Sequence, residues 1–347
     1  MATTEYGVNH PLAVKAWAKK LFVEALKDTY FSRFMGTGSD NIIQIKTELQ
    51  KGPGDRITQG LRMQLSGTGV QGDGTLEGNE EALTTYSDNI LINQIRHAVR
   101  SAGKMSEQRV PFDVREEAKD GLKDWWSDRL DTAFFNSIAG NTGQADTKYT
   151  GNNATTAPST GRWLFSDGTH TTEASLSTTD TFQLSFIDRA VTTAKVASPK
   201  IRPLKVDGKD KYVMFLHPYQ SHALRVDATS SRITWYDTQK ALVQGGQRDN
   251  PIYNGALGEY NGVVLHESTR IPSVVSNVYR AVLCGGQAAL MAVGQDSSPT
   301  KMNWVEELFD YENQLGVSCG MIFGLKKAVF NSTDFGTVVM STRAVAP

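Results

Sequence analysis

The feature that most constrains the fold is a long, glycine-rich hairpin pattern between residues 42 and 95. Apolar residues alternate with polar ones at Ile57, Leu61, Met63 and Leu65, and a second extended run covers residues 89–95. Eight glycines lie between and around the two runs: Gly52, Gly54, Gly60, Gly67, Gly69, Gly72, Gly74 and Gly78. A two-stranded hairpin has no second layer to cover its apolar face, and the glycines raise the entropy lost on ordering it. The sequence therefore predicts an extended arm that needs a partner surface.

A long helix is predicted directly after this arm, over residues 113–139. Asp113 is the expected N-cap, Glu116 takes the third helical position, and Gly140 supplies the stop. One face is apolar and carries Val114, Ala118, Leu122, Trp126, Leu130, Ala133 and Phe134. About 26 residues at 1.5 Å each span roughly 40 Å, so this helix is expected to be a spine that is supported along its length.

A second amphipathic helix is predicted near the N-terminus, over residues 12–30. Trp17, Leu21 and Phe22 form its apolar stripe, and Pro11 suits a first helical turn. The stripe has two candidate partners, which are the spine helix of the same chain and another molecule.

The remainder of the chain reads as a mixed α and β region. Residues 141–180 are rich in Thr, Ser, Gly and Asn and predict a surface insertion or mobile loop with a short ordered piece at 163–165. Asp180 is expected to cap a helix that ends at Ser198-Pro199. Short strands are predicted at 212–216, 262–265 and 281–283, helices at 219–225 and 233–243, and return strands at 317–328 and 335–341. No internal repeat is apparent.

Composition excludes several classes of protein. The 347 residues carry 36 Lys+Arg and 37 Asp+Glu, a net charge of -1, so no global field attracts nucleic acid or an anionic membrane. No apolar run approaches the roughly 18 residues of a membrane span, and the N-terminal residues lack the pattern of an export signal. Cys284 and Cys319 are expected to be buried hydrophobic residues rather than a disulfide or zinc ligands.

Two short motifs suggest chemistry, but their context argues against it. Gly67, Gly69 and Gly72 spell the G-x-G-x-x-G of a dinucleotide site, yet the acidic, glycine-rich continuation resists the helix that must follow. Gly316-Val317-Ser318-Cys319-Gly320 spells the G-x-S-x-G of a hydrolase, but the last histidine, His266, precedes the serine. His217 and His222 are five residues apart, which does not place both on one helical face for a metal. No catalytic, cofactor or metal residues are predicted.

A family resemblance emerges from longer stretches. The run GDRITQGLRMQLSGTGVQGDGTLEGNEEALTTYSDNILINQIRHAV, followed by MSEQRVPFDVREEAKDGLKDWW and by YVMFLHPYQSHALR, resembles the major capsid proteins of N4-type podophages. That family has the α+β coat fold of tailed phages, named after phage Hong Kong 97. The resemblance implies an N-terminal arm at 1–44, an extended loop at 45–100, a peripheral domain at 101–179 completed by strands at 303–347, and an axial domain at 180–302.

The same resemblance implies a function and partners. The chain is expected to self-assemble, as hexamers and pentamers, into the icosahedral head of a virion around double-stranded DNA, contacting that DNA weakly and without sequence preference. A separate scaffolding protein, a portal and a possible decoration protein would take part, with assembly in the host cytoplasm and no membrane. We expect six residues at contacts between subunits: Arg62, Glu80, Glu81, Asp88, Trp17 and Phe22. The alternatives are an encapsulin-like compartment shell, and a soluble enzyme that is either a hydrolase using Ser318 or a nucleotide enzyme using Gly67 to Gly72.

Overall fold

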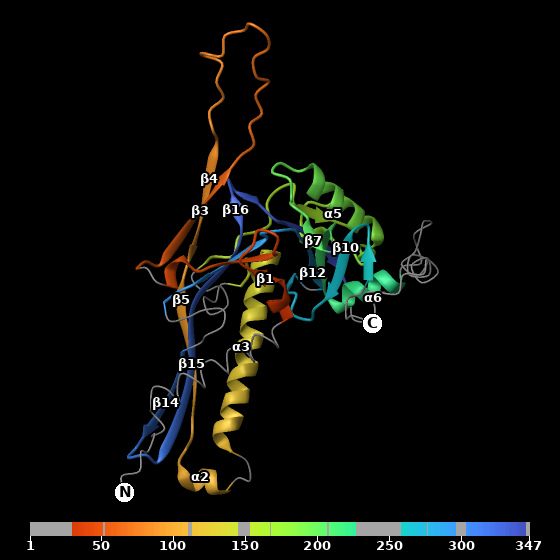
Figure 1. The fold of residues 1–347 in the computed structure, drawn as a ribbon. Helices are drawn as coiled ribbons and strands as arrows, with labels where there is room; N and C mark the ends of the chain where they lie inside the picture. The colour runs from red at the N-terminus through yellow and green to blue at the C-terminus, as the bar shows by residue number, and fades with distance from the viewer. Residues whose placement is uncertain are drawn as a thin grey trace.

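The computed structural model describes residues 30–50, 53–109, 113–144, 153–166, 168–206, 208–226, 258–275, 277–295 and 303–344. Figure 1 shows an elongated molecule in which one long helix, α3, runs beside a long sheet, a lobe lies to one side, and a thin arm projects at one end. The helices predicted at 12–30 and 233–243 lie outside the described residues. Among the helices that the structure describes, none is long and apolar enough to cross a membrane.

The predicted spine helix is confirmed as α3, Val114–Ala139. The Asp113 side chain accepts a hydrogen bond from the amide of Arg115, and Gly140 adopts the left-handed conformation at the C-cap. A side chain at Gly140 would meet the backbone oxygen of Thr156 at 2.7 Å. The stop is therefore both a conformational and a packing requirement.

The long sheet supports α3 along its length. Its strands are β1 (Met35–Gly36), β2 (Ile43–Lys46), β13 (Ala289–Val293), β15 (Gln314–Lys327) and β14 (Asn303–Phe309), with β5 (Asn93–Arg100) on the other edge of β15. Alternate residues of β15, such as Cys319 and Phe323, join Trp126 of α3 in one hydrophobic core. Two short helical segments, η1 (Tyr30–Phe34) and α2 (Lys104–Arg109), lie near the two ends of α3.

The lobe is built on a second sheet of eight strands. Its strands are β6 (Trp163–Phe165), β18 (Thr337–Arg343), β12 (Val278–Cys284), β8 (Lys209–Leu216), β10 (Val263–Glu267), β9 (Gly258–Tyr260), β7 (Leu204–Val206) and β11 (Ser273–Val275). One face, including Phe215 and Val282, joins the core of α3. The other face, including Met214 and Leu283, packs on α5 (Leu184–Val196). The predicted strands at 212–216, 262–265 and 281–283 and the helix at 219–225 (α6, Pro218–Val226) are confirmed.

The prediction for residues 141–180 is confirmed in one part: the short ordered piece at 163–165 is the strand β6 (Trp163–Phe165). The expected mobile loop is wrong for residues 153–166 and 168–180, which pack onto the protein. β6 pairs in parallel with β18, and Arg162, Glu173 and Asp180 are buried. The polar composition suggested a loop, but these side chains find partners: Arg162 donates to the Pro199 carbonyl, Asp180 bonds Ser166 and Ser177, and Glu173 bonds distant strands. Arg280 of β12 bonds both carboxylate oxygens of Glu173, beside the short helix η3 (Glu173–Ser175).

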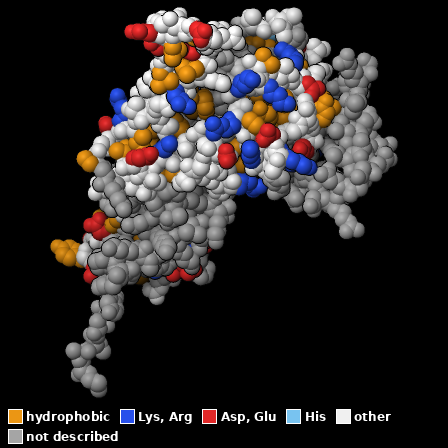
Figure 2. Space-filling model, turned by 45° about the horizontal axis from the view of Figure 1, so that its top comes forward, with side chains coloured by type: hydrophobic (Ala, Val, Ile, Leu, Met, Phe, Trp, Pro, Cys, Tyr) orange, Lys and Arg blue, Asp and Glu red, His pale blue; other side chains and the backbone are white. Residues whose placement is uncertain are grey.

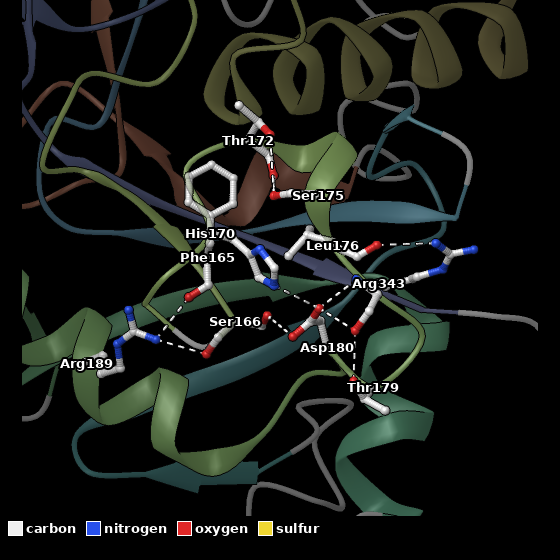
Figure 3. Close-up of polar contacts among 11 residues, drawn as sticks. Phe165, Ser166, His170, Thr172, Ser175, Leu176, Thr179, Asp180, Arg189 and Arg343 are labelled. Carbon is white, nitrogen blue, oxygen red and sulfur yellow. Dashed lines mark hydrogen bonds and ion pairs between the residues drawn. The ribbon is translucent and has the colours of Figure 1, made fainter.

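The predicted cap at Asp180 is also wrong. The residue before α5 is Gln183, and it makes no side-chain cap. The Asp180 carboxylate instead accepts hydrogen bonds from the hydroxyls of Ser166 and Ser177 and lies 3.3 Å from His170. Figure 3 shows this cluster, in which Arg343 also donates to the carbonyl of Leu176. These contacts fold residues 166–180 onto the lobe rather than leaving them in solvent.

The predicted hairpin is real but shorter than residues 42–95. β2 belongs to the long sheet, and the hairpin consists of β3 (Arg56–Arg62) and β4 (Thr85–Leu91). After Ile92 the chain enters the long sheet as β5. Three short segments remain: η2 (Glu48–Gln50), β16 (Val329–Phe330) and β17 (Thr333–Asp334). β16 contacts β4 at the base of the hairpin.

Candidate functional site

The arm, residues 63–84, projects beyond the last paired strand residues. The amide of Met63 donates to the carbonyl of Thr84, which extends the ladder by one step. Every residue from 64 to 85 is exposed, including four aliphatic ones: Leu65, Val70, Leu76 and Leu83. Figure 1 shows this segment standing clear of the rest of the molecule. The arm therefore has almost no packing within its own chain.

The arm is nevertheless shaped by its own polar contacts. The carboxylate of Glu81 accepts hydrogen bonds from the amides of Ser66 and Gly67, at 2.8 and 2.6 Å, and from the Ser66 hydroxyl. The two amides lower the pKa of Glu81. Glu80 accepts a bond from the amide of Gly78 at 2.8 Å. The two carboxylates hold the strands and the turn of the arm in an open, hairpin-like path.

The charge of the arm has one sign. Residues 63–84 contain four acidic residues, Asp73, Glu77, Glu80 and Glu81, and no Lys or Arg. A surface that receives the arm would need cations together with apolar area for the exposed aliphatic side chains.

The base of the arm is anchored firmly. Ile57 of β3 and Ile90 of β4 are buried with Leu290 and Phe330. The Asn153 side chain bonds both the amide and the carbonyl of Leu91, at 2.9 and 2.8 Å. β15 crosses so close at this point that a side chain on Gly324 would stand 2.0 Å from the Leu91 oxygen.

Asp88 is part of this anchor. It is 8% exposed, its carboxylate contacts the ammonium of Lys326, and it accepts a hydrogen bond from the amide of Val329 at 3.1 Å. Sequence reasoning missed Lys326 and Asn153, because both partners are distant in the chain and no local spacing signals them. The contact of Asp88 with another subunit stays a prediction.

We call the face of the long sheet that points away from α3 the outer face. By register and alternation it consists of Arg96, Ala98 and Arg100 of β5, Gly316, Ser318 and Gly320 of β15, and Val305, Glu307 and Phe309 of β14. Val305 is 47% exposed, and the two arginines are exposed as well.

The G-x-S-x-G motif lies at the centre of the outer face. A side chain at Gly316 would stand 2.6 Å from the Phe309 ring, and one at Gly320 would stand 2.7 Å from Arg96. Because these two positions of β15 are glycine, the side chains of Phe309 and Arg96 can lie against the strand. The guanidinium of Arg100 lies 4.3 Å above the centre of the Phe309 ring. The motif serves packing, and the Ser318 hydroxyl donates to the carbonyl of Val305 within the sheet.

The exposed positions of α3 include Glu116, Glu117, Asp120, Asp124 and Asp128. The partly exposed positions of the same helix carry Arg115, Lys119, Lys123 and Arg129. Arg62 is exposed at the start of the arm. Glu80 and Glu81 lie on the arm itself, and Trp17 and Phe22 lie outside the described residues.

The residues considered for chemistry form no active site. The glycines of G-x-G-x-x-G lie on the exposed arm, and no helix follows them there. The His217 ring accepts a hydrogen bond from the Tyr219 amide at the start of α6. Cys284 and Cys319 are buried, and burial raises the pKa of both thiols. Within the described ranges, no group of three or more His, Cys, Asp or Glu could hold a metal ion.

Comparisons with known proteins cover nearly the whole chain. A family model described as phage capsid protein matches residues 5–346. The chain is 29% identical over 369 residues to the major capsid protein of Pseudomonas phage KPP25, with 93% of each sequence covered. The capsid of Ralstonia phage GP4 has a similar structure, with a TM-score of 0.78, 34% identity, and coverage of 100% of this chain and 99% of that one. The capsid of cyanophage Pam1 has a similar fold, with a TM-score of 0.75, 21% identity, and 100% and 95% coverage.

Proposed function

Because the chain belongs to the phage capsid protein family, we propose that its arm is the element that joins one copy to the next in the head of a tailed phage. The protein is structural and is not an enzyme, and its fold is the Hong Kong 97-like fold of tailed-phage coats. The observation that carries the proposal is the continuous exposure of residues 64–85 with their aliphatic side chains. Such a ribbon gains burial only from another molecule.

The proposed receiving surface is the outer face of a neighbouring copy. Its centre is covered by Phe309 and Arg96, which lie over Gly316 and Gly320, and Val305 offers exposed apolar area. Arg96 and Arg100 oppose the carboxylates of the arm, with Glu307 as an acidic group on the same face. Arg100 is held in place by Phe309 and by a contact with Gln314, so little side-chain entropy is lost when it meets a carboxylate.

The remaining assignments follow the family resemblance and are supported by the arrangement of elements. We assign residues 1–44 to an N-terminal arm, 45–100 to the extended loop, 101–179 with 303–347 to the peripheral domain, and 180–302 to the axial domain. The contribution of α3 and β15 to one core supports joining the two parts of the peripheral domain. We place Trp17, Phe22, Arg62, Glu80, Glu81 and Asp88 at contacts between subunits.

We also propose a setting for the assembly. The N4-type podophages are the subfamily that the sequence runs resemble, with assembly in the host cytoplasm and a separate scaffolding protein, a portal and a possible decoration protein as partners. Double-stranded DNA is the proposed content of the shell. The near-neutral net charge of -1 suits a wall that does not hold its genome tightly.

Electron microscopy of the purified full-length chain at high concentration tests the proposal. Closed shells, tubes, or five- and six-fold rings are the expected particles. The matched variant replaces residues 64–83 by Asn-Gly, which fits a two-residue turn between Met63 and Thr84, whose backbones are already paired. This variant should fold and remain unassembled. Normal shells from it would overturn the role of the arm, and a monomeric wild type under every condition would overturn self-assembly.

A further inference from the structure

A cavity of about 750 Å³ opens in the lobe. It lies between the C-terminal turn of α5, the segment 200–203, the beginning of β8 and the turn between β9 and β10. Ile201 and Tyr212 of the lining are 2% and 5% exposed, and the Tyr212 hydroxyl donates to the Ile201 carbonyl. The lining combines apolar surface with charged groups.

Three cations line this cavity: Lys195, Lys200 and Arg202. All three are exposed, and none forms an ion pair with another residue in the part of the chain that the structure describes. Asp210 is the acidic residue of the lining. The lining thus carries a net positive charge and several unused donors.

The other acidic groups nearby are already engaged. Asp188 accepts hydrogen bonds from the Tyr260 hydroxyl, at 3.1 Å, and from the Asn261 amide, at 2.9 Å. Glu259 pairs with Lys211 at 2.8 Å. These carboxylates are not available to neutralise the cations of the cavity.

The positive surface continues onto the hairpin of β7 and β8. Lys205 and Lys209 are exposed on it, and Asp207, between them in the sequence, lies outside the described residues. Figure 2 shows Lys and Arg side chains gathered over the middle of the face that it presents. Several cations spaced over a concave, polar surface match a ligand with several negative charges.

We propose that this basic cavity and its rim bind phosphates of the double-stranded DNA enclosed by the shell. The inference rests on the proposed function, since it assumes that the shell contains DNA. Exposed lysine and arginine side chains suit phosphodiester groups, whose affinity is electrostatic and independent of sequence.

The strength of this contact is set by the small number of cations. Each phosphate neutralised contributes about -0.9 to the slope of log affinity against log salt concentration, so three give a slope of about -2.7. Affinity then falls on the order of forty-fold between 50 and 200 mM salt. Such a contact orders DNA at the wall without preventing its release.

Fluorescence anisotropy of a double-stranded DNA oligomer of arbitrary sequence, with unassembled full-length protein, tests the site. Substituting all three cations, K195Q/K200Q/R202Q, should reduce the magnitude of the salt slope by about 2.7. The matched control, R56Q/K104Q/R109Q, removes three exposed cations elsewhere. It should change the slope much less. Equal losses in the two variants, or no loss in the first, would overturn the assignment. Equally tight, cation-dependent binding of poly-glutamate would replace phosphate by carboxylate as the ligand.

A footprint on intact heads keeps the test valid if the triple variant does not fold. Lys195 and Lys200 should react more slowly with an acylating reagent in DNA-filled heads than in emptied ones, as read by mass spectrometry of the peptides. Lys104 serves as the reference. Intact shells with equal reactivity in both states would overturn this inference and leave the proposed function untouched. Absence of shells would instead count against the proposed function.

Discussion

Arg280 and Glu173, 107 residues apart, form a buried bidentate ion pair with N–O distances of 2.6 and 2.9 Å. The same guanidinium donates to the carbonyls of Ala139 and Gly140, the last turn of α3, and lies 4.8 Å from the centre of the Trp163 ring. One side chain of β12 therefore ties together the spine helix, the segment before α5 and the sheet of the lobe. A cation at a helix C-terminus is also favoured by the helix dipole.

Removing one partner of this pair is expected to be costly. Arg280→Met leaves Glu173 charged in a buried site and two helix carbonyls without a donor, so the free energy of unfolding should fall by about 3–5 kcal/mol. The double variant R280M/E173L should lose less than the sum of the two single variants, because it leaves no unpaired charge. Urea unfolding of the unassembled protein measures both. If Arg280→Met lowers the free energy of unfolding by less than about 0.5 kcal/mol, Arg280 does not hold these three elements together.

The close crossing at Gly324 gives a second prediction. A methyl group there stands 2.0 Å from the Leu91 oxygen, so Gly324→Ala should shift the backbone at the base of the arm and destabilise the protein by about 1–3 kcal/mol. Gly121→Ala is the control, since that exposed glycine of α3 has nothing within 4 Å of the new methyl group. It should stabilise the protein by about 0.5–1 kcal/mol. Similar effects of the two changes on the urea midpoint would refute the close approach.

Asp131 gives a prediction about pH. Burial raises the pKa of this α3 carboxyl to about 6. The amides of Tyr30 and Phe31 and the guanidinium of Arg270 lower the pKa, but burial has the larger effect. Between about pH 4 and pH 6 the native state therefore binds more protons than the unfolded state, and stability falls as the pH rises through this window. Urea midpoints of the wild type should fall relative to Asp131→Asn from pH 4 to pH 6 and change little above pH 7.

Asp128 provides the control for that measurement. Its side chain is 64% exposed and also contacts Arg270. Its charge is the smallest of the causes that shift the pKa of Asp131, so Asp128→Asn should keep the fall in stability from pH 4 to pH 6, slightly reduced. A wild type that instead gains stability relative to Asp131→Asn as the pH rises would mean that Arg270 outweighs burial.

The charges of the arm give a fourth prediction. E77K/E80K should slow shell formation because it places cations opposite Arg96 and Arg100, and R96E/R100E should slow it for the converse reason. Combining the four substitutions should restore part of the rate, since opposite charges then face each other again. Light scattering at low salt measures the rate. Unchanged assembly in both double variants would remove these charges from the contact.

The sequence predicts some parts of this fold better than others. The spine helix was predictable because its period, its Asp113 cap and its Gly140 stop are all local signals. The exposed arm was predictable because its glycines and charges permit no core. The packing of residues 153–180 was not, apart from the strand at 163–165, because Glu173 looks like a loop residue until Arg280 and Ser341, far along the chain, supply its partners.

The candidate site divides in the same way. Glu80 and Glu81 lie on the arm where the pattern indicated, but the anchor of Asp88 on Lys326 spans 238 residues and has no local signature. The outer face was equally hidden, since G-x-S-x-G suggests a nucleophile until the strand register shows Phe309 and Arg96 lying over its glycines. Long-range pairing, rather than composition, decides these features.

Cross-linking between two separately labelled copies tests the central claim most directly. A Glu80→Cys variant and an Arg96→Cys variant are co-assembled and oxidised, and any disulfide between the two introduced thiols must join different subunits. The native Cys284 and Cys319 are buried and contribute no background. We predict cross-linked dimers in the co-assembled particles and none in the unassembled mixture. Well-formed particles that show no such cross-link would contradict the docking of the arm on the outer face of a neighbour.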